Sequence, residues 1–172
     1  MSVHVDDFYV ISNTKSSLNE LYDLLVARYK NVSRKMNATL TYLGMAITRN
    51  HSNHILVTQP AYIDKILTAT DMLECSGCTT PMSTDQSFND KFNNEPVNYQ
   101  LYLKHVGLIN YLAGQSRPDL LYSLSRAAQH CSSPKLSDMK RIKRIIRYIK
   151  HTKDIGITFN CDNDMRLIIH IC

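Results

Sequence analysis

The sequence is poor in residues that mark several functional classes, with no tryptophan, five glycines, five prolines and five cysteines among 172 residues. So few glycines leave no glycine-rich loop that could cradle phosphate groups. An odd number of cysteines without an export signal predicts reduced thiols rather than a disulfide framework. Cys75 and Cys78 form a C-x-x-C pair, but no second pair completes a zinc site, so we interpret the spacing as coincidence in a loop.

Long apolar runs are also absent. No stretch approaches the roughly 18 consecutive apolar residues that a membrane span needs. The first residues lack the charged, apolar and small-residue regions of a signal peptide. We therefore expect an intracellular protein, in the cytoplasm or the nucleus, that is not secreted and does not use a membrane.

The composition is typical of a globular chain, with 44% hydrophobic and 20% charged residues and no long run of one charge sign. Its length suits one domain or two small ones. Twenty Lys and Arg against fifteen Asp and Glu give a formal net charge of +5. The excess lies near the C-terminal end, so its placement is more informative than its size.

The first third of the sequence predicts two strands and a helix. β-branched and aromatic residues on both sides of Asp6 and Asp7 predict two short strands that meet at a tight turn. The segment Ser17-Leu18-Asn19-Glu20 has the pattern of a capping box, and an apolar stripe at helical spacing continues from it to Tyr29. We therefore expect a helix that starts at this box.

Residues 39–48 (TLTYLGMAIT) and 54–58 (HILVT) predict the next two strands. The Arg-Asn-His-Ser-Asn segment between them predicts the turn of a hairpin. Gly44 lies inside the first run, and a glycine within a strand usually marks a bulge or a close backbone approach.

From Pro60 onward the pattern is mainly helical, because apolar residues recur every three or four positions up to residue 67. Residues 74–97 are rich in Asn, Ser, Thr and Pro and predict a surface loop that marks an internal boundary. The remaining predicted elements are helices over 99–113 (ended by Gly114), 119–131 and 138–151 (capped by Ser137), and two terminal β-like runs without a partner sheet, 155–159 and 166–171.

The adjacent carboxylates of Asp6 and Asp7 allow two interpretations. Hard oxygen ligands, usually one or two carboxylates together with substrate phosphates, are how proteins hold Mg²⁺. Asp is also enriched in turns for reasons unrelated to metals, so the pair taken alone is compatible with a solvated turn. The seven histidines are scattered and suggest no further metal cluster.

The helix predicted over 138–151 is strongly basic. Its apolar residues form one stripe, and six cations occupy the rest of its surface. Such a basic face has three interpretations: it can contact the phosphate backbone of a nucleic acid, it can lie on an anionic membrane surface, or it can be a solvated outer face. These candidate nucleic-acid contacts are Lys140, Arg141, Lys143, Arg144, Arg147 and Lys150.

Taken in order, these motifs resemble the reverse transcriptase region of the Pol polyprotein of Ty1/copia-type retrotransposons, over nearly the whole chain. The segment His4-Val5-Asp6-Asp7 is similar to the family's Tyr-Val-Asp-Asp box, with His in place of the usual aromatic. Residues 42–47 (YLGMAI) are similar to the hairpin that grips the primer end, and residues 56–63 (LVTQPAYI) to the entry of the thumb. Similarity to the thumb and the link toward ribonuclease H continues through 80–82 (TPM), 105–107 (HVG), 111–112 (YL), 117–120 (RPDL), 143–152 (KRIIRYIKHT) and 156–157 (GI).

The resemblance implies an α+β fold: a partial reverse transcriptase palm of short antiparallel strands plus a helix, then a helical thumb-like bundle and a terminal β-hairpin. It divides the chain into a partial palm (1–59), a thumb-like region (60–152) with the loop 74–97, and the start of the link to ribonuclease H (153–172). The implied activity is RNA-directed DNA synthesis with two divalent metals, Mg²⁺ being the expected cofactor.

The same resemblance assigns roles to individual residues. Asp6 would be the principal catalytic metal ligand and Asp7 the supporting carboxylate, while Gly44 and Met45 would lie at the primer backbone. The basic helix would approach an RNA or DNA template-primer duplex.

The resemblance also implies parts that residues 1–172 do not contain: an upstream palm aspartate, the fingers, and the catalytic residues of ribonuclease H. Two carboxylates on one turn are not expected to hold two ions about 4 Å apart. We therefore expect a fragment that is inactive alone and whose partner is the missing palm and fingers half of a polyprotein. A second interpretation is a non-enzymatic module that binds nucleic acid or protein through the basic helix 138–151.

Overall fold

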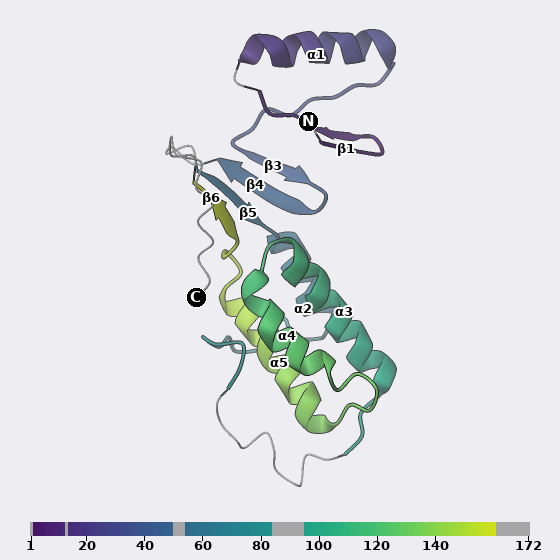
Figure 1. The fold of residues 1–172 in the computed structure, drawn as a ribbon, viewed down its shortest axis with the longest axis vertical. Coiled ribbons are helices and arrows are strands. Elements are labelled where there is room, and N and C mark those ends of the chain that lie inside the picture. The colour runs from purple at the N-terminus through teal and green to yellow at the C-terminus, as the bar shows by residue number, and fades with distance from the viewer. Residues whose placement is uncertain (1, 13, 50–53, 84–94, 161–172) are drawn as a thin grey trace.

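A computed structural model describes residues 2–12, 14–49, 54–83 and 95–160. Along the long axis of the molecule, an N-terminal hairpin and helix are followed by a four-stranded sheet and then by a bundle of helices (Figure 1). This arrangement confirms the expected α+β class. The predicted run 166–171 lies outside the described residues, as does the turn 50–53.

The N-terminal hairpin confirms the predicted tight turn. Strand β1 (Ser2–His4) pairs antiparallel with β2 (Asp7–Tyr9), and His4 lies opposite Asp7. The turn therefore consists of Val5 and Asp6, with Asp7 already in the second strand. Val5 has a φ of 51°, in a left-handed region that a β-branched residue rarely adopts.

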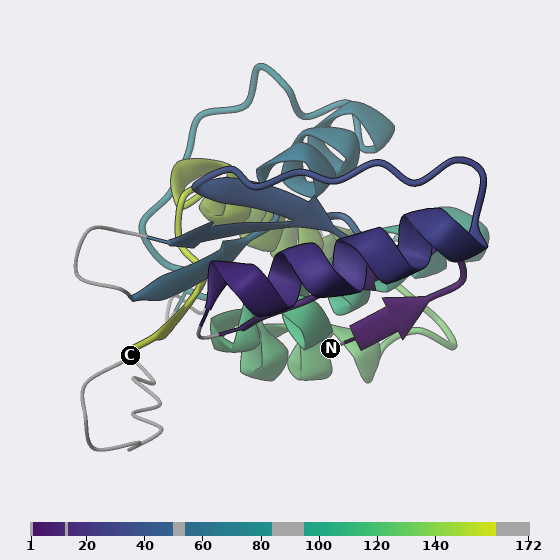
Figure 2. The ribbon, with the colours of Figure 1, turned by 90° about the horizontal axis from the view of Figure 1, so that it is seen from above.

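Helix α1 (Lys15–Arg28) begins earlier than the sequence predicts. Thr14 is its N-cap and accepts a hydrogen bond from the backbone N–H of Ser17 at 3.4 Å. The capping box predicted at Ser17 is therefore wrong, because that residue is already in the first turn of the helix. No residue of α1 is buried, and Leu24 is 69% exposed. Seen from above, the helix is the outermost layer at its end of the molecule (Figure 2).

The second sheet contains β3 (Thr39–Tyr42), β4 (Met45–Arg49), β5 (Ile55–Thr58) and β6 (Ile157–Phe159), in that order and all antiparallel. The single strand predicted over 39–48 is wrong, because Leu43 and Gly44 form a two-residue turn with φ of 50° and 77°. Gly44 therefore supplies a hairpin turn rather than a bulge. The predicted pairing of 54–58 with the preceding strand is confirmed as β4 with β5.

Strand β6 corrects another expectation. The run 155–159 was expected to have no partner sheet, yet Ile157 lies opposite Val57 and extends the sheet beyond β5. Gly156 permits this approach, because a Cβ at that position would lie 2.0 Å from the carbonyl oxygen of Val57. The chain thus returns to its first half after the helices.

The helical half follows the predicted order with different ends. Helix α2 (Pro60–Ala69) has the expected buried face. Helix α3 (Tyr99–Gln115) continues through Gly114, which therefore does not end it, and a 3-10 turn, η3 (Pro118–Leu120), precedes α4 (Leu121–Ala128). Helix α5 (Leu136–His151) is not capped by Ser137: Asp138 accepts the backbone N–H of Lys135 at 2.9 Å.

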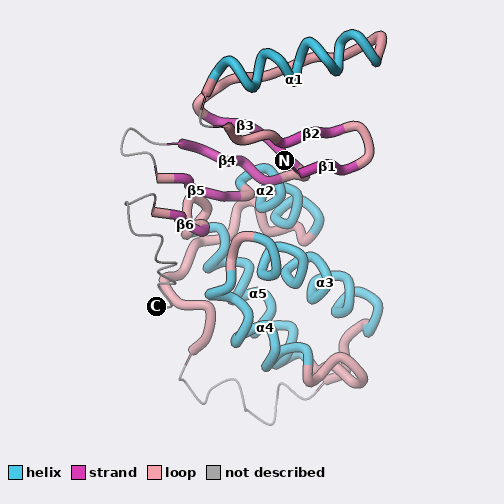
Figure 3. The backbone as a smooth tube through the Cα atoms, turned by 45° about the horizontal axis from the view of Figure 1, so that its top comes forward, coloured by secondary structure: helices cyan, strands magenta, loops and turns pink. Residues whose placement is uncertain are grey.

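The core lies among the helices rather than in the sheets. Figure 3 shows helices α2 to α5 gathered together, with the strands on one side of them. Every buried hydrophobic residue in the described part of the chain falls between Ile63 and Ile149. Fully buried side chains from three helices, Ile63, Ile109 and Ile142, illustrate how α2, α3 and α5 pack together. The buried hydrophobic core of the described residues is therefore formed by the helical half of the chain.

Candidate functional site

The carboxylate turn, Asp6 and Asp7, is an exposed feature of the first hairpin. Asp6 is in the turn itself and Asp7 is the first residue of β2, so the two carboxylates lie at the same end of the hairpin. Both residues are exposed. Such carboxylates can coordinate a divalent cation, since their oxygens are accessible and are hard ligands.

The described residues do not complete a metal site around this turn. No group of three or more His, Cys, Asp or Glu side chains that could hold a metal ion occurs within residues 2–12, 14–49, 54–83 and 95–160. Two carboxylates match the number that proteins usually offer to one Mg²⁺, but a two-metal site needs further shared ligands. The fit of these residues to Mg²⁺ is therefore partial.

The β3–β4 turn places Gly44 and Met45 beside the first hairpin. The rings of Tyr9, at the end of β2, and Tyr42, at the end of β3, lie with centroids 5.4 Å apart. Because Tyr9 follows Asp7 by two residues and Tyr42 directly precedes Leu43, this ring pair holds the two hairpins together near their functional candidates.

The same turn is tied to the bundle. The hydroxyl of Tyr111, on α3, donates to the carbonyl oxygen of Leu43 at 3.4 Å, and its ring packs 4.7 Å from that of Tyr62 on α2. Gly44 is exposed and Met45 is half-buried. The backbone of the turn is thus positioned by the bundle while its outer surface stays accessible.

The basic side chains of helix α5 differ in what they contact. Residues 73–80, which we call the strap, run along the helix and accept hydrogen bonds from three of its six basic side chains. Arg147 donates to the carbonyl oxygen of Ser76 at 2.7 Å, and Lys150 donates to the carbonyl oxygens of Leu73 and Cys75. Arg147 and Lys150 therefore bind the backbone of the strap.

Arg144 completes the attachment of the strap by donating to the hydroxyl of Thr80 at 2.8 Å. Gly77 lies so close to α5 that an added Cβ would be 2.9 Å from the Cβ of His151. Farther up the helix, Arg141 forms an ion pair with Asp138 at 2.9 Å. Lys140 and Lys143 are exposed.

The C-x-x-C pair lies in the strap. Cys75 and Cys78 are free thiols, and Cys78 donates to the carbonyl oxygen of Arg144 at 3.4 Å. The interpretation of this spacing as a loop feature agrees with its position, and the thiol contributes to the contact between strap and helix.

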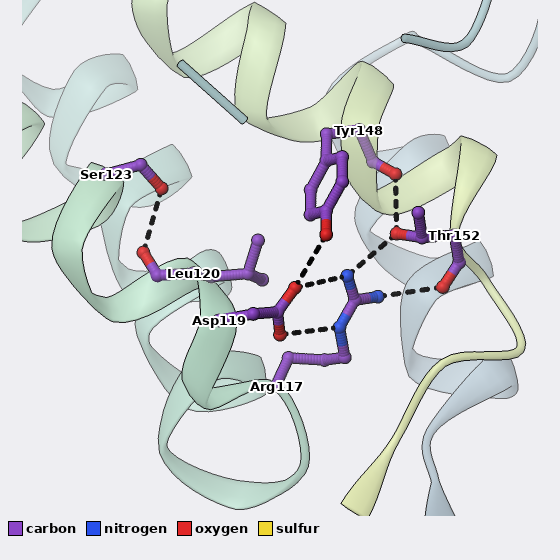
Figure 4. Close-up of polar contacts among 6 residues, drawn as sticks. All are labelled: Arg117, Asp119, Leu120, Ser123, Tyr148 and Thr152. Atoms are coloured by element: carbon purple, nitrogen blue, oxygen red, sulfur yellow. Dashed lines mark hydrogen bonds and ion pairs between the residues drawn. The ribbon is translucent and has the colours of Figure 1, made fainter. Parts of the chain in front are cut away.

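A buried polar network that the sequence did not single out joins η3 to the end of α5 (Figure 4). Arg117 is fully buried and makes two hydrogen bonds to the carboxylate of Asp119, at 2.9 and 2.8 Å. It also donates to the carbonyl and the hydroxyl of Thr152 at 2.9 and 2.7 Å. The hydroxyl of Tyr148 donates to Asp119 at 3.0 Å.

This network shifts the pKa of two of its members in opposite directions. Burial by itself would raise the pKa of Asp119, but hydrogen bonds and charge from Arg117, together with the Tyr148 hydroxyl, lower that pKa overall. Burial and the adjacent carboxylate raise the pKa of Tyr148. Thr152 is the C-cap of α5, where a cation is favoured by the helix dipole. The network therefore fixes the helix end from which β6 continues.

Composition rules explain why this network was missed. Arginine is almost never fully buried unless it is paired, so a lone Arg before a Pro reads as a surface residue. The available signal was the Arg-Pro-Asp spacing, which places a carboxylate two residues from the guanidinium. In the sequence analysis, this Arg-Pro-Asp segment contributed only to the family resemblance.

None of the helices among the described residues is long and apolar enough to cross a membrane. Comparison with protein-family models gave no match, and no solved structure matches the chain.

Curated relatives cover almost the whole chain. Over 97% of its length it is 30% identical to the retrovirus-related Pol polyprotein from transposon RE1 of Arabidopsis thaliana, and 29% identical to the one from transposon RE2 of the same plant. The chain spans 11% of the length of each of these polyproteins. It is also 26% identical, over 87% of its length, to an uncharacterised mitochondrial protein of Arabidopsis thaliana, of which it covers 60%.

Proposed function

Because this chain is homologous to a segment of the retrovirus-related Pol polyproteins of Ty1/copia-type transposons, we propose that it corresponds to part of a reverse transcriptase. The observation that carries the proposal is the carboxylate turn: two exposed Asp side chains on a tight β-hairpin, at the position similar to the family's Tyr-Val-Asp-Asp box. Its backbone supports a functional role, because Val5 holds an unfavourable left-handed conformation next to Asp6, and such strain clusters at functional sites.

In this proposal the first hairpin contributes carboxylate ligands for Mg²⁺, Asp6 as the principal ligand and Asp7 as the weaker one. The β3–β4 turn, with Gly44 and Met45, lies against the primer backbone. The ring pair of Tyr9 and Tyr42 supports this arrangement, because it keeps the two hairpins adjacent. The bound metal would supply Lewis-acid stabilisation of charge on phosphate oxygens.

Other ligands of the metal site come from outside the described residues in this proposal. The 172-residue polypeptide by itself is therefore expected to extend no primer, since its described carboxylates do not form a group of three. The partner that supplies the rest is another part of a Pol polyprotein.

The exposed apolar surface of the N-terminal elements supports such a partner. Helix α1 buries none of its residues, and Ile11 and Leu24 are 67% and 69% exposed. The β1–β2 sheet has two strands, and an isolated two-stranded hairpin is marginally stable in water. Additional strands packed on this hairpin and helix would bury both.

Two measurements with the 172-residue protein test the proposal. A mobility-shift titration with a primer-template duplex across a salt series is expected to give a slope of log K on log salt of about −3 or steeper. Absence of salt-dependent duplex binding contradicts the proposal and favours a module that binds another protein.

Primer extension with Mg²⁺ or Mn²⁺ tests the second half of the proposal. No template-directed incorporation is expected from the polypeptide alone. Incorporation that disappears in Asp6→Asn would show that residues 1–172 form a complete site, and would contradict the requirement for a partner.

A further inference from the structure

Thr80, the last residue of the strap, lies against the guanidinium group of Arg144 on α5. Its hydroxyl accepts a hydrogen bond from Nη2 of Arg144 at 2.8 Å, and the residue is exposed. The strap is fixed close to this point, because the thiol of Cys78 donates to the carbonyl oxygen of Arg144 at 3.4 Å. The Thr80 side chain is therefore held beside a cation while it stays accessible to solvent.

Arg144 has an unused hydrogen-bond donor next to this hydroxyl. Its Nε atom is buried and has no hydrogen-bond partner in the described part of the chain. The N–H groups of Nε and Nη2 point from the same edge of a guanidinium, and this edge can bind two oxygens of one anion at once. Arg117 shows the completed arrangement in this protein, because its Nε and Nη2 donate to the two carboxylate oxygens of Asp119 at 2.9 and 2.8 Å (Figure 4). The same edge of Arg144 binds one neutral hydroxyl.

A phosphate group on Thr80 would supply the missing acceptor. It would add three strong acceptor oxygens, and a charge of about −1.5 to −2 at pH 7, to the side chain that Arg144 already contacts. A phosphorylated side chain opposite an arginine forms charge-assisted hydrogen bonds, which are roughly twice as strong as neutral ones. The buried Nε is the atom that such a phosphate is expected to satisfy.

The residue after Thr80 also points to this modification. It is Pro81, and a proline directly after the hydroxyl residue is the feature that proline-directed protein kinases select. Proline restricts the preceding residue to extended conformations, in which kinases bind their substrate segments. The sequence has one other such pair, Ser133-Pro134, but there the proline is buried, whereas Pro81 is half-buried. Thr80 is therefore the more accessible of the two candidates.

We propose that Thr80 is a phosphorylation site for a proline-directed serine/threonine kinase and that Arg144 binds the phosphate. The kinase transfers the γ-phosphoryl group of ATP to Oγ1 of Thr80. The bond from the γ-phosphorus to the β,γ-bridging oxygen breaks, the bond to Oγ1 forms, ADP leaves, and the hydroxyl proton passes to a base of the kinase. Nε and Nη2 of Arg144 then donate to two phosphate oxygens and fasten the end of the strap to α5. Neither step depends on metal binding at Asp6 and Asp7.

Phosphorylation of the 172-residue protein by a purified mitogen-activated protein kinase, with Mg²⁺ and ATP, tests the site. Peptide mass spectrometry is expected to locate phosphate on Thr80, and this phosphate should be lost in Thr80→Ala and in Pro81→Ala. The matched control is Thr79→Ala, because Thr79 is also exposed but is followed by Thr. This control should accept phosphate as the wild-type protein does. Phosphate at other positions alone, or none while a Thr-Pro peptide is phosphorylated, overturns the proposal.

The melting temperature of the phosphorylated protein tests the role of Arg144. New charge-assisted hydrogen bonds are expected to raise it by roughly 2–4 °C relative to the unphosphorylated protein. The same comparison within Arg144→Gln should give no rise, while Arg126→Gln, which removes an exposed arginine of α4, should keep it. Each variant is compared with its own phosphorylated form, so a general loss of stability does not affect the result. A rise that persists in Arg144→Gln, or a fall in the wild-type protein, overturns the role of Arg144.

The second ionisation of the phosphate gives an independent readout. Its pKa is ordinarily about 6, and an adjacent guanidinium lowers this pKa because it favours the doubly charged form. Titration followed by ³¹P NMR is expected to give a lower phosphate pKa in the wild-type protein than in Arg144→Gln. Equal pKa values in the two proteins contradict contact between the phosphate and Arg144.

Discussion

Removal of the Arg117 guanidinium should be among the most destabilising substitutions in this chain. Arg117→Met keeps an unbranched apolar side chain but removes both guanidinium hydrogen bonds to the Asp119 carboxylate, which retains the Tyr148 hydroxyl, and removes the guanidinium donor to the Thr152 carbonyl. Breaking a buried ion pair by removing one partner costs about 3–5 kcal/mol. Because the side chain of Asp119 is 24% exposed, water recovers part of its hydration, and the lower end is expected.

A loss of about 3 kcal/mol corresponds to a fall in melting temperature of roughly 6–12 °C for a chain of this size. Urea unfolding followed by circular dichroism measures it, with Arg126→Met as the control. Arg126 is exposed and donates to Gln129 at 3.1 Å, so its removal should change the free energy of unfolding by less than about 0.5 kcal/mol.

A second substitution tests the cause of the loss. If an uncompensated carboxylate is responsible, the double variant Arg117→Met, Asp119→Leu should recover at least about 1 kcal/mol. An Arg117→Met protein as stable as the Arg126→Met control would show that the hydrogen bonds of Arg117 contribute nothing to the stability of the fold.

Three further predictions follow from particular residues. Gly156→Ala should destabilise the protein and detach β6, because the added Cβ would lie 2.0 Å from the carbonyl oxygen of Val57. Gly107→Ala should raise the free energy of unfolding by about 0.5–1 kcal/mol, because Ala favours the helix and its Cβ would have nothing within 4 Å; urea unfolding compares the two variants. Burial lowers the pKa of His105 from 6.5, so below pH 6.5 the unfolded chain binds more protons than the folded one and the free energy of unfolding should fall. His105→Gln should reduce this pH dependence, measured by urea unfolding at pH values from 7.5 to 5. Leu43→Asn should stabilise the chain by about 0.5–1 kcal/mol, because Asn tolerates a φ of 50° better; equal or lower stability would contradict the turn geometry.

The parts of the fold that sequence patterns predicted were the local ones. Helix α2 and helix α5 were identified because their apolar residues recur at helical spacing, and the same residues, such as Ile63 and Ile142, are fully buried. The carboxylate turn was predicted because Asp6 and Asp7 lie between β-forming residues.

The parts that were missed depend on long-range contacts or on unusual turn residues. Leu43 occupies a left-handed position where Asn or Asp would have signalled a hairpin, so local patterns predicted one strand over 39–48. Only the family resemblance led us to expect the hairpin over 42–47 that β3 and β4 form. No local pattern reveals that Ile157 pairs with Val57, since the two are separated by the whole helical bundle. The burial of Arg117 likewise depends on Thr152, which lies 35 positions away.

The sequence predicted which basic residues of α5 belong to the candidate site, and the structure shows that they make different contacts. The pattern of α5 showed how many cations it carries but not that Arg147 and Lys150 hold the strap. Helical spacing alone treats a cation that binds a carbonyl oxygen and one that faces solvent as equivalent. The division between them became visible only through the fold of residues 73–80.

The proposed function requires that the carboxylates of Asp6 and Asp7 bind a divalent metal ion. Titration of the ¹⁵N-labelled chain with Mn²⁺ tests it most directly, because a bound paramagnetic ion broadens nearby amide resonances. The amides of residues 4–8 are expected to broaden at the lowest Mn²⁺ concentrations, and the double variant Asp6→Asn, Asp7→Asn is expected to abolish this broadening. Resonances of this turn that stay sharp while other amides broaden would contradict it.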